Sequence, residues 1–263
     1  MEYFTWNVDP VLISILGLKI HWYGALFAAA ILSGLQVMKW IFKQEKANLE
    51  LLDSLLVYCV IGIILGARLG HCLFYDPAYY LSNPLKIIAI WEGGLASHGG
   101  GLGVIIAVYL FQRKFNVSYL WLLDRLAIAT ALFGFFVRSA NFMNSEIIGE
   151  PTDVKWAVIF ERIDLLPRHP AQLYEALSYL AIFILLISLY KQTKIKDYGG
   201  ALLGSFLSLV FTARFMIEFV KVKQAAYNSD IWLNTGQLLS IPFFLIGIYL
   251  IYRSRNNTKL SSN

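Results

Sequence analysis

The chain has 263 residues, of which 58% are hydrophobic and only 15% are charged. Soluble domains carry about 25% charged residues, because they need a polar shell against water. The composition therefore excludes a soluble globule, and with it disordered, collagen-like and disulfide-framework proteins. The net charge of +5 is scattered between apolar runs, whereas a nucleic-acid site needs basic residues on one face. We therefore predict an integral membrane protein that binds no nucleic acid.

The chain begins with an apolar segment, residues 11–20, that is too short to span a membrane and fits a strand or an interfacial segment. Seven longer runs follow, each near the 20 or so residues that a spanning helix needs: 21–42, 52–75, 86–112, 118–140, 172–190, 199–220 and 235–252. The connection 141–171 is acidic and contains the strand-like KWAVIF. We expect an all-α polytopic membrane protein with seven transmembrane helices. Residues 1–263 would form a single integral membrane domain, with 141–171 as a small extracytoplasmic cap.

Basic residues in the connections predict the orientation. They are denser in the first, third and fifth connections and in the C-terminal tail than elsewhere. Because such connections stay in the cytoplasm, the N-terminus and the cap are expected outside and the C-terminus in the cytoplasm. The N-terminus also lacks the pattern of a cleaved signal peptide.

Five basic residues fall inside the apolar runs or at their edges: Lys39, Arg68, Arg125, Arg138 and Arg214. Each costs roughly 2.5–3.5 kcal/mol at a helix centre and less near an end. Lys39 can extend to the cytoplasmic surface, and Arg125 has an aspartate beside it. The other three arginines fall in the outer half of the membrane, where the orientation also places Tyr23, His98, His169 and Glu175.

Arginines gathered at one depth repel each other unless negative charge joins them. Two sources of that charge stay open at this point. One is the acidic side chains of the same region, which are Glu92, Glu146, Glu175 and Glu218. The other is a phosphate-bearing ligand, because guanidinium groups match phosphate oxygens. A lipid headgroup is the phosphate most available at that depth.

Two motifs bear on this region. In WEGGLASHGGGLG, residues 91–103, the glycines indicate either close helix packing or a broken backbone around His98. The segment 138–150 contains four candidate residues after its arginine: Asn141, Asn144, Glu146 and Gly149. The asparagines would commonly form turns or caps, but the number of hydrogen-bonding side chains among the nine residues 138–146 favours a headgroup site.

Arg214 and Glu218 lie four residues apart on one helix, so they can simply pair.

Other patterns exclude classes of protein. No phosphate-binding or dinucleotide fingerprint is present, and no serine-hydrolase elbow or paired histidine spacing. We therefore expect no metal and no cofactor. Cys59 and Cys72 lie in one apolar run and are expected to be buried, inert thiols.

Taken together, the motifs resemble those of the bacterial prolipoprotein diacylglyceryl transferase family over nearly the whole chain. The resemblance rests on matches at these positions, given as this sequence has them: His21-Trp22-Tyr23-Gly24, Gly66-Ala67-Arg68 with Tyr75, Trp91-Glu92-Gly93-Gly94 with His98-Gly99-Gly100, Arg138 with Asn141-Phe142, Asn144, Glu146 and Gly149, His169-Pro170 with Gln172-Leu173-Tyr174-Glu175, Arg214-Phe215 with Glu218-Phe219, and Gly236-Gln237. The chain departs from the family pattern at Val137, at Ser139 and from Lys221 onward.

The resemblance implies a transferase of the bacterial cytoplasmic (inner) membrane whose active site faces the outer leaflet. It would move the sn-1,2-diacylglyceryl group of phosphatidylglycerol to the lipobox cysteine of a preprolipoprotein. We assign Arg138 and Arg214 to the departing phosphate and His98 to the base. Tyr23, Arg68, Asn141, Asn144, Glu146, Gly149, Glu175, Glu218 and Gln237 complete the expected substrate site. The competing classes are a phospholipid or anion transporter and a membrane scaffold.

Overall fold

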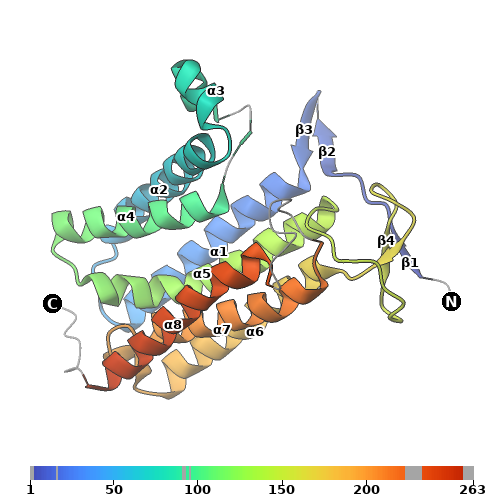
Figure 1. Cartoon of the computed structure of the whole chain (residues 1–263). Helices are drawn as coiled ribbons and strands as arrows, with labels where there is room; N and C mark the ends of the chain where they lie inside the picture. Colours follow the sequence, from blue (N-terminus) through green and yellow to red (C-terminus); the bar gives the residue numbers. More distant parts are fainter. Residues whose placement is uncertain (1–2, 16, 91–92, 95, 223–232, 257–263) are drawn as a thin grey trace. The chain divides into compact units, whose positions relative to one another are not determined.

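The computed structural model describes residues 3–15, 17–90, 93–94, 96–222 and 233–256 (Figure 1). The chain divides into two compact units, one built from Met1–Met38 and Asp124–Leu260 and the other from Lys39–Leu123. This division does not test whether residues 1–263 form a single membrane domain, so that expectation stays a prediction.

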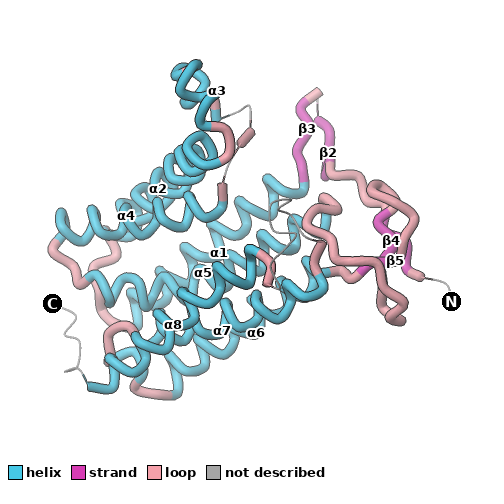
Figure 2. Tube along the Cα trace, in the orientation of Figure 1, coloured by secondary structure: helices cyan, strands magenta, loops and turns pink. Residues whose placement is uncertain are grey.

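The described chain is mostly helical. The first unit contains most of α1 (Trp22–Gln44) and α5 (Tyr119–Met143), and all of α6 (Ala171–Gln192), α7 (Ala201–Ile217) and α8 (Thr235–Asn256). Short 3₁₀ helices, η3 (Ile195–Asp197) and η4 (Glu218–Val220), precede and follow α7. The second unit contains α2 (Leu51–Phe74), α3 (Pro77–Ser82), η1 (Pro84–Ile88) and α4 (Ser97–Phe115). Figure 2 shows the strands in two small groups outside these helices.

Within the described residues, six helices are long and apolar enough to cross a membrane: α1, α2, α5, α6, α7 with η4, and α8. Leu32, Leu65 and Leu245 on three of them are more than half exposed. Large apolar side chains in such positions suit lipid acyl chains rather than water. The predicted multi-pass membrane architecture is therefore confirmed at the level of six helices.

The expected helix over 86–112 differs most from the structure. Its first part is η1, and α4 begins only at Ser97, so the predicted start at residue 86 is wrong by about three helical turns. Gly93 and Gly94 have φ angles of 84° and 70°, a left-handed conformation that glycine adopts readily and that ends regular helix. Residues 91–92, including the candidate Glu92, lie outside the described residues.

The glycines that follow pack α4 against α2. A Cβ atom at Gly62 would lie 2.6 Å from the Gly103 carbonyl oxygen, and one at Gly70 would lie 2.9 Å from Gly99 Cα. The backbones of the two helices therefore approach each other closely, as small residues allow in membranes. Both interpretations of the 91–103 motif hold: a broken backbone before His98 and close packing after it.

Both expected strand regions are confirmed. Residues of the first form a hairpin, in which β2 (Val11–Ile15) pairs antiparallel with β3 (Leu18–His21). In the connection 141–171, β4 (Val158–Phe160) pairs antiparallel with β5 (Pro167–Arg168). On its other side β4 pairs parallel with β1 (Phe4–Trp6), near the start of the chain. Phe142, Val158 and Phe160 form the hydrophobic core of this small sheet.

Candidate active site

The predicted residues at the end of α5 form one network. Arg138 Nε lies 3.0 Å from Glu175 Oε2 on α6, and its Nη1 donates to Asn141 Oδ1 at 3.2 Å. The side-chain amides of Asn141 and Asn144 donate to the two carboxylate oxygens of Glu146 at 3.0 and 3.1 Å. A guanidinium and a carboxylate are thus held in fixed positions by polar neighbours.

The loop around Glu146 has an unusual backbone. Ser145 and Ile147 on either side have φ angles of 56° and 55°, which is rare for a β-branched residue such as isoleucine. Gln172, fully buried on α6, donates to the Glu146 carbonyl oxygen at 2.5 Å. Such conformations persist only where the surroundings impose them, and they concentrate at functional sites.

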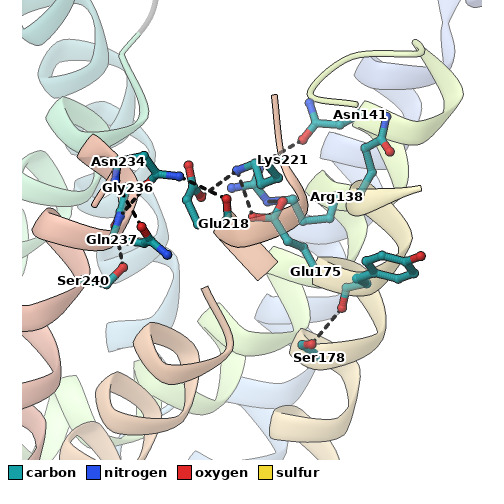
Figure 3. Close-up of polar contacts among 12 residues, drawn as sticks. Arg138, Asn141, Glu175, Ser178, Glu218, Lys221, Asn234, Gly236, Gln237 and Ser240 are labelled. Atoms are coloured by element: carbon teal, nitrogen blue, oxygen red, sulfur yellow. Dashed lines mark hydrogen bonds and ion pairs between the residues drawn. The ribbon is translucent and has the colours of Figure 1, made fainter. Parts of the chain in front are cut away.

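Lys221 is a site residue that we did not predict. Its ammonium group lies 3.4 Å from Glu175 Oε1 and 3.1 Å from Glu218 Oε2, and its side chain is 2% exposed. Figure 3 shows Lys221 between Glu218 and the Arg138–Glu175 pair. A buried ammonium group is tolerated because it is paired. Its position three residues after Glu218 was the signal available in the sequence.

Arg214 lies on α7 one turn before Glu218, yet the two side chains do not pair. Glu218 pairs with Lys221 instead, and within the part of the chain that the structure describes Arg214 forms no ion pair. Arg214 is half-buried and lines a small cavity together with Glu175 and Tyr179. The alternative that Arg214 and Glu218 neutralise each other is not what the structure shows.

Gln237 and its neighbours shape the start of α8. The backbone N–H of Asn234 donates to Gln237 Oε1 at 3.0 Å, and the backbone N–H of Gln237 donates to Asn234 Oδ1 at 2.9 Å. This reciprocal arrangement satisfies amides that a helix start leaves open. A Cβ atom at Gly236 would overlap the Glu218 carboxylate, so α8 approaches this acid closely (Figure 3). Headgroup binding by Gln237 stays a prediction.

Gly149 and Tyr23 border the same network. The Gly149 amide donates to the His169 carbonyl oxygen at 3.0 Å, and a Cβ atom at Gly149 would lie 2.6 Å from that oxygen and 2.7 Å from the Val220 carbonyl oxygen. Only glycine fits this approach without displacement. Tyr23, the second residue of α1, lies within electrostatic range of Glu146 and Arg138.

Arg68 and His98 belong to the second unit. Arg68 is 3% exposed, and all three of its guanidinium nitrogens donate to backbone carbonyl oxygens of residues 86–94. His98 is the second residue of α4 and is exposed. The structure therefore brings ten of the predicted residues into the first unit and two into the second.

The six apolar helices, with paired charges buried between α5, α6 and the end of α7, define a multi-pass membrane protein with a polar site inside its helices. A family model described as prolipoprotein diacylglyceryl transferase matches residues 10–253. The chain belongs to this family.

Similar proteins carry the corresponding name. The chain is 57% identical to a phosphatidylglycerol–prolipoprotein diacylglyceryl transferase of Tolumonas auensis, over 95% of this chain and 96% of that one. It is 46% identical to the protein of that name from Chloroherpeton thalassium, over 98% and 97% of the two chains. The identity is 47% to the Porphyromonas gingivalis protein of that name, over 97% and 96%.

Proposed function

We propose that the chain transfers the sn-1,2-diacylglyceryl group of phosphatidylglycerol to the lipobox cysteine of a preprolipoprotein. The products are a thioether and sn-glycerol 1-phosphate, and the reaction is the first step of bacterial lipoprotein maturation. Family membership and the names of the similar proteins support this reaction. The structural observation that carries it is the charge available at Arg214.

The ion pairs of the network leave Arg214 available for a phosphate. Arg138 and Lys221 pair with Glu175 and Glu218, and the Glu146 carboxylate accepts hydrogen bonds from Asn141 and Asn144. Arg214 lines a small cavity beside Glu175 and forms no ion pair among the described residues. Because a half-buried guanidinium is costly without an anion, it is suited to bind a phosphate oxygen.

The chemistry assigns the roles. The acceptor sulfur attacks the glyceryl carbon that carries the phosphate ester, so a carbon–sulfur bond forms and the carbon–oxygen bond breaks. The electron pair leaves with glycerol phosphate, whose growing negative charge Arg138 and Arg214 stabilise. Such preorganised charge contributes a few kcal/mol to catalysis.

The acceptor thiol must also lose its proton. A cysteine thiol has an ordinary pKa of about 8.5 and is mostly protonated near neutral pH. His98 is assigned as the base, because imidazole titrates in the required range. Glu175 and Glu218 hold Arg138 and Lys221, and Glu146 orients Asn141 and Asn144. Tyr23, Asn141, Asn144 and Gln237 offer hydrogen bonds to the headgroup.

The proposal includes the location. The chain lies in the bacterial cytoplasmic membrane with its N-terminus and cap outside, its C-terminus in the cytoplasm and its active site open to the outer leaflet. In this arrangement α4 is the seventh span. Its 19 residues, Ser97–Phe115, correspond to about 28 Å of helix, close to the thickness of the hydrocarbon layer.

The test is a mass measurement on the purified protein with phosphatidylglycerol and a lipobox peptide. We expect diacylglyceryl-modified cysteine together with released glycerol phosphate. Arg138→Ala and Arg214→Ala should abolish transfer in folded protein, whereas Arg113→Ala, which changes an exposed arginine, serves as the matched control and should retain it. Lipid movement between leaflets without either product would instead establish the transporter. Full activity of both site variants would overturn the phosphate site.

A second measurement addresses the base. His98→Gln should lose most activity near pH 7 and recover part of it as the pH rises above the pKa of the acceptor thiol. Partial activity with an unchanged pH profile would limit His98 to positioning the lipid.

A further inference from the structure

The Arg68 guanidinium group donates four hydrogen bonds, all of them to backbone carbonyl oxygens. Its Nε donates to the Ile87 carbonyl oxygen at 2.8 Å and its Nη2 to the Lys86 carbonyl oxygen at 2.5 Å. Its Nη1 donates to the carbonyl oxygens of Gly93 and, at 3.2 Å, Gly94. One guanidinium group therefore joins two separate stretches of the segment 86–94 to α2.

The surroundings of Arg68 leave no room for an anion. The residue is 3% exposed, and Cζ lies 5.0 Å from the centre of the Tyr80 ring. A Cβ atom at Gly94 would lie 2.9 Å from Nη1, so the backbone itself closes the site. The left-handed glycines allow the carbonyl groups to turn toward the cation. A phosphate would have to displace these carbonyls to reach it.

The same segment leads directly into the helix that carries His98. The Ala96 amide donates to the carbonyl oxygen of Ala67, the neighbour of Arg68, at 2.9 Å. A Cβ atom at Gly99 would lie 3.0 Å from Gly70 Cα on α2. The first turn of α4 is thus fixed to α2 on both sides of His98, and Arg68 fixes the chain that enters it.

We infer that Arg68 is a positioning residue, which holds residues 86–87 and 93–94 against α2 so that α4 begins at Ser97 and His98 is oriented for proton transfer. This inference rests on the proposed function and on His98 as the base. It gives Arg68 a role other than the substrate binding predicted from the sequence, which stays a prediction. Loss of the Arg68 hydrogen bonds should therefore slow turnover near neutral pH without weakening the binding of phosphatidylglycerol.

The test compares Arg68→Lys with the wild type at pH 7 and at about pH 9.5. The compact ammonium group of lysine cannot reach all four carbonyl oxygens that the planar guanidinium group of Arg68 binds. Misplacement of a catalytic group by about 1 Å costs about 100-fold in rate. We expect kcat to fall at least about tenfold at pH 7, with the KM for phosphatidylglycerol within about threefold. At pH 9.5 the acceptor thiol is mostly ionised without a base, so the deficit should shrink to about threefold.

Two controls make the outcome decisive. Arg138→Lys, in the proposed phosphate site, should keep its deficit at both pH values, and Arg125→Lys, a buried arginine that donates to the Lys196 carbonyl oxygen, should change neither constant. If Arg68→Lys does not fold, Gly94→Ala, which crowds the same nitrogen, replaces it.

A raised KM with unchanged kcat, or a deficit equal at the two pH values, would overturn the inference. The absence of product from the wild-type protein would be a failure of the proposed function instead, and it is measured first.

Discussion

Lys221 offers a quantitative test of the charged network. Replacement by methionine keeps the length of the side chain and removes its charge. Glu175 retains Arg138 at 3.0 Å, but Glu218 loses the ammonium group at 3.1 Å while its side chain is only 10% exposed. The variant therefore isolates the cost of one buried carboxylate that has lost its ion pair.

The loss of one partner sets the size of that cost. Removing one partner of a buried ion pair typically costs about 3–5 kcal/mol. We therefore expect Lys221→Met to lower the free energy of unfolding by about 3–5 kcal/mol. Against a usual total of about 5–15 kcal/mol this is a large loss.

Denaturant titrations of the protein in detergent, followed by the fluorescence of its seven tryptophans, would measure this loss.

The matched control is the double variant Lys221→Met with Glu218→Gln. Replacing both partners removes the uncompensated charge, so most of the stability should return. A single variant within 1 kcal/mol of the wild type, or a double variant no more stable than the single one, would refute the reasoning.

Three shorter predictions concern the cap and the cysteines. Gly149→Ala should destabilise the protein by about 1–3 kcal/mol, because its Cβ atom would overlap His169, and a normal midpoint of thermal unfolding would contradict this. The hydrogen bond from the Arg168 guanidinium lowers the pKa of Asp164, so Asp164→Asn should be less stable than the wild type at neutral pH, and the difference should vanish as the pH falls through that lowered pKa. Cys72→Ser should keep its transfer activity, and its loss would indicate a covalent role for this buried thiol.

Composition and periodicity predicted the membrane helices well, because the bilayer imposes one length and one kind of side chain on every span. Short patterns also indicated a strand or an interfacial segment before α1, where the structure has β2 and β3, and a strand in KWAVIF, where it has β4. The start of α4 could not be predicted in the same way. It depends on two left-handed glycines and on carbonyl groups that turn toward Arg68, which is a long-range contact.

Pairing was harder to predict than membership of the site. The spacing of Arg214 and Glu218 favours an ion pair on one helix, but Lys221 competes for the same carboxylate from three residues beyond it. The Lys221 side chain is buried with its charge between Glu175 and Glu218, a position that no local pattern specifies. Departure from the family pattern at Lys221 was visible, whereas its consequence required the contacts.

The two arginines of the proposed phosphate site differ in what holds them. Arg138 is fixed by Glu175 and by Asn141, so its direction is set before any ligand arrives. Arg214 has no such restraint among the described residues and lines the cavity beside Glu175. A fixed cation stabilises charge that develops at one place, because it needs no reorganisation during the reaction. A cation that has no ion pair among the described residues must be oriented by the ligand itself. In the proposed reaction, in which both arginines stabilise the departing phosphate, Arg138 therefore needs less reorganisation than Arg214.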